Sequence, residues 1–338
     1  MLNLAHLDRL QEGRVLLAFS GGVDSSALFH LLLENHIAFD IAHVNYHTRP
    51  SSDAEAENAE ELAKKNNLIC HTHSCHLAGG NFEHRAREER YRFFSYLMNK
   101  YSYRYLLTAH QLNDRLEWLM MQFCRGSGLP ELLGIRSIDL RDGITIVRPL
   151  LEHDRQSIEE YLHEHSISYY TDESNVDERY TRNFFRHRYS APLMRDYRDA
   201  IRRSFRYLEE DNESLIEHID FEESDGLYYV RNPLNSRSLI VGMDTLLKSL
   251  GYVLSGSEKE LLKSDKCCVI GRVYVVWIDE EYTFIAPYHP NVVMDKGFKE
   301  ECRRLKIEPK LRGFLYGSGK AWATIRRLKD APTPLRFD

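Results

Sequence analysis

The chain has 338 residues and a net charge of −6, with 43% hydrophobic and 28% charged residues, so we expect two or three domains. No apolar stretch approaches the roughly 20 residues that cross a bilayer, and the first residues, MLNLAHLDRLQEGR, lack the features of a signal peptide. The six cysteines include no C-x-x-C pair, which favours reduced thiols in a cytoplasmic protein, and the net charge argues against a uniformly nucleic-acid-binding surface.

Residues 14–30, RVLLAFSGGVDSSALFH, predict a strand, a glycine turn and the start of a helix. Such a turn offers backbone N–H groups and the positive end of a helix dipole to an anion, above all a phosphate. Gly21 and Gly22 allow close approach, and neighbouring serine hydroxyls add donors. The stretch lacks the Gly-Lys-Ser/Thr of a Walker A loop, and SGGVDSS resembles the pyrophosphate loop (PP-loop) of ATP pyrophosphatases. The alternative is an ordinary glycine turn with Asp24 as a helix cap.

Strand and helix patterns then alternate along the chain. Strands are expected at 39–44, 68–74, 105–108 and 144–147, and helices at 53–66, 83–100 and 112–124. This alternation predicts an α/β fold with a doubly wound, mostly parallel sheet. Ligands of such sheets bind at the carboxyl ends of the strands.

Polar and basic residues follow two of these strands. The stretch 43–49, HVNYHTR, would lie where a base or ribose sits beside the phosphate loop, or would form a polar surface loop. Arg87 and Arg90 are three residues apart on a helix and could clamp phosphates. The alternative is a solvated face that pairs with nearby glutamates.

A pair of carboxylates follows the strand that ends at His110. Asp114 and Glu117 are three residues apart, so both project from one side of the predicted helix. This arrangement suits Mg²⁺ carried by ATP, or an ammonium group. Asp114 alone could also be a first-turn helix residue.

Together these motifs resemble those of the tRNA(Ile)-lysidine synthase family. The ordered matches run from residue 14 to 188 and comprise SGGVDS, HVNYHTR, AREERYRFF, TAHQLNDRLEW, RGSG, RPLL, DESN and RNFFR. Tyr46, Asn113 and Trp118 depart from the family pattern, whereas Asp114 and Glu117 match it. The resemblance implies the PP-loop, adenine nucleotide α-hydrolase-like fold and the ATP-dependent joining of L-lysine to the wobble cytidine of tRNA(Ile) with a CAU anticodon.

The resemblance also implies roles for individual residues. The expected ATP-binding residues are Ser20, Gly21, Gly22, Val23, Asp24, Ser25, Ser26, His43, Asn45 and Arg87. The expected catalytic residues are Asp24, Arg90, Asp114, Glu117 and Arg182. Mg²⁺ would arrive with ATP, with Asp24 and Asp114 as candidate ligands.

The pattern changes after residue 190. We expect a PP-loop catalytic domain at 1–190, a helical linker at 191–222 and an α+β region at 223–338. Short strands are predicted at 227–230 and 237–241, a helix at 243–254, and a hairpin from 267–277 and 282–286. Residues 296–337 carry twelve Lys or Arg against four Asp or Glu, with Phe314, Tyr316 and Trp322 interleaved. This composition predicts tRNA binding, or else a solvated basic surface over a small aromatic core.

Several alternatives remain at this stage. His71, His73 and Cys75 would share one face of a strand and could hold Zn²⁺, although no second ligand cluster completes the set. Rival functions are a PP-loop tRNA thiolase, with Cys124 near the site, a small-molecule PP-loop ligase, or a non-catalytic module that binds ATP or RNA. A homodimer is plausible in the family, and no membrane association is expected.

Overall fold

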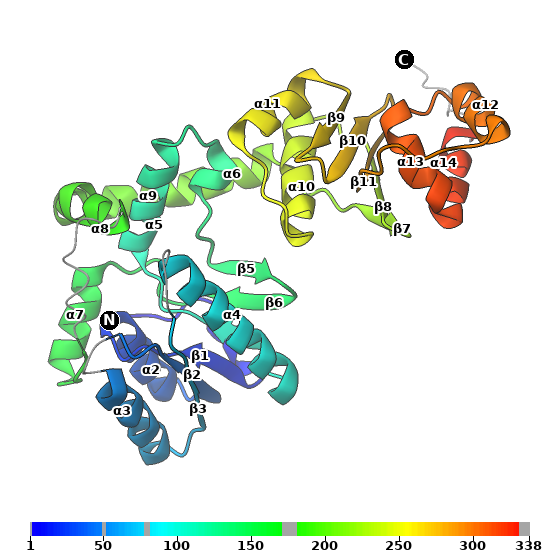
Figure 1. The fold of residues 1–338 in the computed structure, drawn as a ribbon. Helices are drawn as coiled ribbons and strands as arrows, with labels where there is room; N and C mark the ends of the chain where they lie inside the picture. Colours follow the sequence, from blue (N-terminus) through cyan, green and yellow to red (C-terminus); the bar gives the residue numbers. More distant parts are fainter. Residues whose placement is uncertain (1, 49–51, 78–81, 171–180, 331–338) are drawn as a thin grey trace. The chain divides into compact units, whose positions relative to one another are not determined.

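A computed structural model describes residues 2–48, 52–77, 82–170 and 181–330 (Figure 1). The chain divides into two compact units, Met1–Glu210 and Asp211–Asp338. Residues 172–175 of the predicted DESN motif and Arg49 lie outside the described residues. Within the described parts, no helix has both the length and the apolar character needed to span a bilayer.

The first unit contains a six-stranded sheet in the order β3-β2-β1-β4-β6-β5. The strands are β1 (Val15–Ala18), β2 (Phe39–Asn45), β3 (Cys70–Ser74), β4 (Tyr105–Leu107), β5 (Ile138–Arg141) and β6 (Ile144–Val147). All neighbours pair in parallel except β5, which runs antiparallel to β6 at one edge. The predicted doubly wound sheet is confirmed, and β5 is an addition that the sequence pattern did not reveal.

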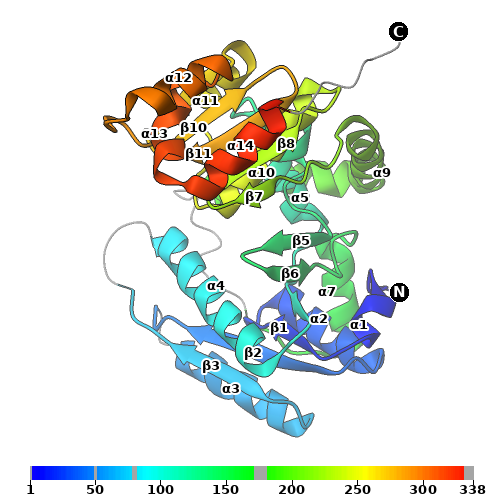
Figure 2. The same cartoon turned by 90° about the vertical axis from the view of Figure 1, so that its right-hand side faces the viewer.

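Helices cover both faces of this sheet (Figure 2). They are α1 (Leu7–Gln11), α2 (Val23–Glu34), α3 (Ser52–Lys65), α4 (Phe82–Tyr101), α5 (Leu112–Phe123), α6 (Leu129–Leu132), α7 (Arg155–Glu164), α8 (Thr181–Phe185), the π-helical turn η2 (Arg186–Ser190) and α9 (Ala191–Leu215). Residues of α2, α3 and α7 pack with Val15 and Leu17 on one face. Leu16, next in sequence between them, packs with α4 on the other face. Alternate residues of a strand point to opposite faces, so β1 is buried on both sides.

The strand order reverses beside β1. The chain runs from β1 through β2 to β3 on one side, and β4 then pairs with β1 on the other. In sheets of this type, ligands bind in the crevice at the carboxyl ends of the strands on either side of such a switch point. The glycine turn leaves β1 there, and the loop before α5 leaves β4 there.

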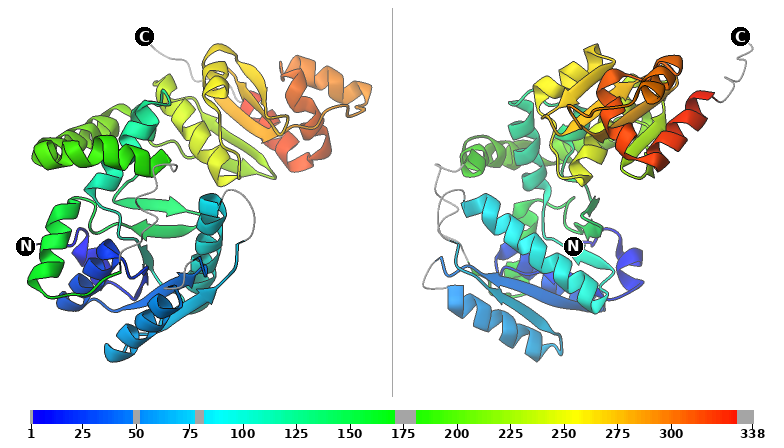
Figure 3. Two further views of the ribbon diagram at one scale, coloured as in Figure 1. Left: turned by 60° about the vertical axis from the view of Figure 1, so that its left-hand side comes forward. Right: turned by 45° about the vertical axis from the view of Figure 1, so that its right-hand side comes forward.

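The second unit is built on a five-stranded antiparallel sheet in the order β7-β8-β11-β10-β9 (Figure 3). Its strands are β7 (Glu222–Ser224), β8 (Leu227–Arg231), β9 (Cys267–Ile270), β10 (Tyr274–Ile278) and β11 (Tyr282–Pro287). Its helices are α10 (Ser236–Ser249), α11 (Gly256–Ser264), α12 (Lys296–Arg304), α13 (Pro309–Gly317) and α14 (Gly319–Asp330). Helices α10 and α11 cover one face and α12 to α14 the other, which confirms an α+β C-terminal region.

Two predictions in this unit are wrong. The strand expected at 237–241 is the first part of α10, because Asn235 caps the helix by accepting from the N–H of Arg237. Leu239, Ile240, Met243 and Leu247 then bury one helical face. The run expected as one strand over 267–277 forms β9 and β10, because Gly271 and Arg272, with φ of 54° and 59°, turn the chain back. The β10–β11 hairpin is confirmed.

Candidate active site

The loop after β1 has the backbone geometry of an anion cradle. Gly21 adopts a φ of 75°, which favours glycine, and Gly22 is the N-cap of α2 without a side-chain cap among the described residues. The N–H groups of the first turn of α2 therefore face the crevice, where they can bind a phosphate. Ser25 Oγ donates to the Gly22 carbonyl at 3.1 Å, and Ser26 Oγ donates to the Gly21 carbonyl at 3.2 Å. These two hydroxyls brace the loop from within.

Ser20 and Tyr170 complete the loop. Ser20 Oγ lies 3.1 Å from Ser25 Oγ and accepts from the Gly22 N–H at 3.4 Å. The Tyr170 N–H donates to the Gly21 carbonyl at 2.9 Å. A methyl group added to Gly21 would lie 3.4 Å from the Tyr170 ring. The loop is therefore anchored by a residue about 150 positions later in the chain.

Asp24, in the first turn of α2, carries a partly neutralised charge. Its Oδ2 accepts from Arg155 Nη1 at 2.9 Å, and Arg155 Nε also donates to Glu159 at 2.6 Å. Asp24 Oδ1 is buried without a hydrogen-bond partner among the described residues. Burial raises the pKa of Asp24 to about 6, and Asp114 adds to the rise, whereas Arg155 opposes it. An orphaned carboxylate oxygen here fits a cation or donor that arrives with a ligand.

Asp114 and Glu117 lie together on α5, as their spacing predicted. Asp114 Oδ2 accepts from the Gln111 N–H at 3.0 Å and so closes a capping box at the start of α5. The two residues are 7% and 1% exposed, which is rare for carboxylates unless they are paired.

The pairing partners come from α8 and η2. Arg182 donates to Asp114 Oδ1 at 2.5 Å and to Glu117 Oε2 at 2.9 Å. Arg186 Nε donates to Glu117 Oε1 at 2.7 Å, and its Nη2 lies 3.7 Å from Asp114 Oδ1. Two guanidiniums thus neutralise two carboxylates. Arg182 was predicted from its motif, and Arg186 lies four residues later, on the same helical face, which is the signal that could have identified it.

The electrostatics of this cluster extend to His110. Burial alone would raise the pKa of Asp114, but Arg182, His110 and the Gln111 N–H together hold it below its usual value. Asp114 raises the pKa of Arg182. Burial, with nearby arginines, lowers the pKa of His110 to about 4, so its imidazole is neutral at physiological pH.

The residues expected beside the adenosine are held by local contacts. His43 Nδ1 lies 3.1 Å from the Phe19 carbonyl, which links the end of β2 to the residue after β1. Asn45 Nδ2 donates to Asp53 at 2.7 Å, and its Oδ1 accepts from the His47 N–H at 2.9 Å. His43 and Asn45 thus lie at the carboxyl end of β2, and His43 contacts the residue that precedes the loop.

Arg87 and Arg90 are exposed on α4. No carboxylate of the described residues lies within ion-pair distance of either. Both add positive charge to α4, and the charge of Arg87 helps to lower the pKa of His110. The alternative interpretation, in which both arginines pair with nearby glutamates, therefore has no ion pair to support it among the described residues.

The histidine and cysteine cluster on β3 makes ordinary contacts. His71 Nε2 lies 2.7 Å from the Tyr103 hydroxyl, and His73 Nε2 lies 2.8 Å from Glu89. Across the described ranges, no group of three His, Cys, Asp or Glu side chains is placed to hold a metal ion.

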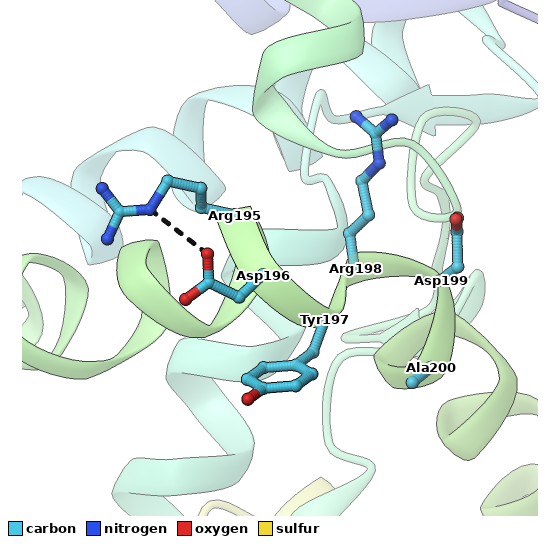
Figure 4. Close-up of a pocket in the computed structure, with 6 residues that line it drawn as sticks. All are labelled: Arg195, Asp196, Tyr197, Arg198, Asp199 and Ala200. Carbon is cyan, nitrogen blue, oxygen red and sulfur yellow. Dashed lines mark ion pairs between the residues drawn. The ribbon is translucent and has the colours of Figure 1, made fainter.

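A hollow in the surface of α9 lies at a break in that helix. It is lined by residues 195–200, and Tyr197 has a non-helical φ of −133° (Figure 4). Arg195 Nε lies 3.5 Å from Asp196, its neighbour in the chain. The hollow contains none of the predicted site residues.

Comparison with known proteins decides the family. Residues 2–192 match the PP-loop domain. A tRNA(Ile)-lysidine synthase of Wolinella succinogenes is 43% identical over 320 residues, which are 94% of this chain and 98% of the relative. The chain belongs to the tRNA(Ile)-lysidine synthase family. The same family name is carried by a Helicobacter pylori relative, 38% identical over 92% of both chains, and by a Campylobacter jejuni relative, 40% identical over 91% of this chain and 94% of the other.

A solved structure supports the fold. The U34-tRNA thiolase NcsA from Methanococcus maripaludis aligns with a TM-score of 0.50 at 16% identity, over 63% of this chain and 76% of that one. At this identity the similarity concerns the fold alone. Family membership therefore rests on the sequence relatives, and the PP-loop architecture on both.

Proposed function

We propose that the chain joins free L-lysine to carbon 2 of the wobble cytidine of tRNA(Ile) with a CAU anticodon, with consumption of ATP. The observation that carries the proposal is the identity of 35–43% to tRNA(Ile)-lysidine synthases along almost the whole chain. The geometry agrees with it, because a phosphate-binding turn and two buried carboxylates meet at one switch point of the sheet.

The reaction has two steps. The carbonyl oxygen at carbon 2 of cytosine attacks the α-phosphate of ATP, and pyrophosphate leaves. The lysine ε-amine then attacks carbon 2, and AMP leaves. An amide-like oxygen is a poor leaving group and becomes a good one as a phosphate ester. The site must therefore grip pyrophosphate, neutralise charge on the α-phosphate and exclude water.

The turn formed by residues 20–26 would bind the departing diphosphate through the N–H groups of α2, whose dipole favours negative charge. Mg²⁺ supplied with ATP would neutralise phosphate charge. Asp24 is the residue that best fits it, because its buried Oδ1 has no partner among the described residues. Arg155 holds the other oxygen and keeps the carboxylate oriented.

The carboxylates of Asp114 and Glu117 would receive the lysine ammonium group, and this requires an exchange. Both are already paired with Arg182 and Arg186. An ammonium group can take its place beside both carboxylates only when one of these two guanidiniums moves away. Arg182, the more exposed of the two at 41%, would move towards the α-phosphate, whose charge replaces that of the carboxylates.

The second unit would contribute tRNA binding. Exposed basic residues between Lys296 and Asp330, such as Arg303, Lys306 and Lys320, form no ion pair with a described residue. Of the three aromatic residues predicted to stack on bases, Phe314 is buried and Trp322 packs on Phe298, so these two belong to the core. Tyr316 also packs on Phe298, with 5.0 Å between the ring centroids, although 40% of its surface is exposed. RNA binding by this unit would therefore depend mainly on phosphate contacts.

The test is incorporation of labelled lysine into a tRNA(Ile) transcript with a CAU anticodon, in the presence of ATP and Mg²⁺. The expected result is one lysine per tRNA with release of AMP and pyrophosphate, and none into methionine tRNA, which has the same anticodon. ATP cleavage with sulfur incorporation would instead indicate a thiolase. Absence of ATP cleavage with any acceptor would indicate a binding module.

The same proposal places the enzyme in the cytoplasm. All six cysteines are free, as expected for a reducing compartment. Sedimentation of the full chain will test the proposed homodimer.

A further inference from the structure

Two arginines share one aromatic ring beside the candidate active site. The guanidinium carbon of Arg141, the last residue of β5, lies 3.9 Å from the centroid of the Tyr91 ring. The guanidinium carbon of Arg87 lies 5.3 Å from the same centroid. Tyr91 and Arg87 are four residues apart on α4, so the β5–β6 hairpin and α4 build this cluster together (Figure 2). Stacking on the ring restricts both guanidiniums and leaves their N–H groups to bind an acceptor.

The cluster carries an excess of positive charge. Desolvation of its guanidinium by the neighbouring side chains, and then the charges of Arg141, Arg90 and Arg148, lower the pKa of Arg87, so four guanidiniums lie within electrostatic range of one another. Two carboxylates offset them within the described structure: Asp142 lies 3.5 Å from Arg141, and Asp139 lies 3.3 Å from Arg148. Like charges gathered in this way repel, and a bound anion relieves the repulsion.

A second observation points to a ligand. Arg148 is 5% exposed, and its Nε is buried without a hydrogen-bond partner among the described residues. Its Nη1 donates to the Arg136 carbonyl at 2.6 Å. A buried donor without a partner is uncommon and is usually satisfied by an acceptor such as a water molecule or an anion.

The position of Arg141 separates its end of the cluster from the expected triphosphate site. In the sheet, β4 and β6 lie between β1 and β5, so β5 is roughly 14 Å from the strand that carries the PP-loop, at about 4.8 Å per strand. Arg141 pairs with Ile144, the first residue of β6, which places it away from the carboxyl edge. At the other end, Arg87 and Arg148 both act on the pKa of His110, at the end of β4. The positive charge therefore extends from the catalytic crevice to the hairpin.

We propose that Arg141 and Arg87, both stacked on the Tyr91 ring, bind a backbone phosphate of the tRNA strand that carries the wobble nucleotide. This inference rests on the proposed function, which requires one nucleotide of a longer strand to enter the crevice. A triphosphate on the PP-loop would reach only the arginines at the crevice, whereas a polynucleotide backbone could contact the positive charge from the crevice to the β5–β6 hairpin. The contact is with phosphate and not with a base edge, so Arg141 positions the strand and contributes to affinity without reading sequence.

The experiment compares full-length wild type with Arg141→Ala in binding to the tRNA(Ile) transcript over a range of salt concentrations. Loss of one phosphate contact in a single-stranded loop lowers the slope of log Kobs against log salt by about 0.7. We expect that decrease, a several-fold weaker tRNA affinity, a raised KM for tRNA and an unchanged kcat. Affinity for ATP, measured separately, stays at the wild-type value.

Two further variants serve as controls. Arg92→Ala removes an exposed arginine of the same helix that already pairs with Glu89, so its salt slope stays at the wild-type value. Tyr91→Phe keeps the ring and binds tRNA like wild type, whereas Tyr91→Leu loses the stack and shows part of the effect of Arg141→Ala. Thermal unfolding of each variant separates a local effect from a loss of folding, and Arg141→Lys keeps the charge if the alanine variant does not fold.

If the slope of log Kobs against log salt is the same in Arg141→Ala as in wild type, the proposal is overturned. An equal loss of ATP affinity also overturns it, since the anion would then be a phosphate of the nucleotide. Failure of the proposed function is a different result: the wild type itself would not incorporate lysine. The comparison of salt slopes still decides whether Arg141 binds RNA in that case.

Discussion

Replacement of Glu117 by glutamine tests the carboxylate pair most directly. Glu117 is 1% exposed and accepts from Arg182 at 2.9 Å and from Arg186 at 2.7 Å. Glutamine has the same shape and keeps one acceptor oxygen, but it leaves two guanidiniums to share Asp114. A hydrogen bond to a charged group contributes about 1.5–3 kcal/mol. Because both arginines are partly exposed and can hydrate, we expect a loss of about 2 kcal/mol in stability, or roughly 4–8 °C in Tm for a unit of this size.

Glu117→Gln should weaken the binding of lysine more than it slows the first step of the reaction. If the ammonium group binds the carboxylate pair, loss of one charge costs about 1.5–3 kcal/mol, which raises the KM for lysine about 10- to 100-fold. The first step does not involve lysine, so single-turnover release of pyrophosphate with tRNA should stay within about threefold of wild type. The assay measures both steps in the same preparation.

A matched control is Glu164→Gln, an exposed glutamate in the last turn of α7 without an ion pair among the described residues. It should leave Tm, pyrophosphate release and the KM for lysine unchanged. A wild-type KM for lysine in Glu117→Gln would refute the assignment of the ammonium group to this pair. A selective loss of pyrophosphate release would assign Glu117 to the first step instead.

Further predictions concern the loop, its acid and a buried arginine. Gly21 has a φ of 75° and Gly251 a φ of 82°, so alanine is strained at either position. Gly21→Ala and Gly251→Ala should each lower the free energy of unfolding by about 1 kcal/mol. Only Gly21→Ala should also weaken ATP binding. Asp24 has a folded pKa of about 6 against 3.8 for the free group, so its contribution favours folding at low pH and is lost as pH rises between these values. The stability of wild type relative to Asp24→Asn should therefore fall over that interval and level off above it, and parallel urea-unfolding profiles would contradict this. Arg115 is 2% exposed, pairs with Glu152 and Glu209, and lies 4.3 Å from the Phe205 ring. Arg115→Ala should therefore lower the free energy of unfolding by about 3 kcal/mol. The exposed control Arg92→Ala should lower it by less than about 0.5 kcal/mol.

Much of the first unit could be predicted from periodicity, because its strands are short apolar runs bounded by glycine and polar residues. Local patterns failed where the tertiary context decided. The residues 237–241 are apolar enough for a strand, and the cap at Asn235 together with burial on the sheet makes them helical. The strand β5 escaped prediction because an edge strand needs little apolar character, and Leu140 in it is 72% exposed.

For the site, the features that depend on residue spacing could be predicted before the fold was known. The glycines after β1 specify the turn, and an interval of three residues places Asp114 and Glu117 on one side of α5. Which charges lie beside the site residues depends on the fold. Arg155, Arg182 and Arg186 come from elements that follow in the chain, and Arg141 reaches Tyr91 across a hairpin that no motif predicted. Spacing determines which side chains share one helix, whereas electrostatic interactions depend on distances between helices, and these exist only after the sheet has formed.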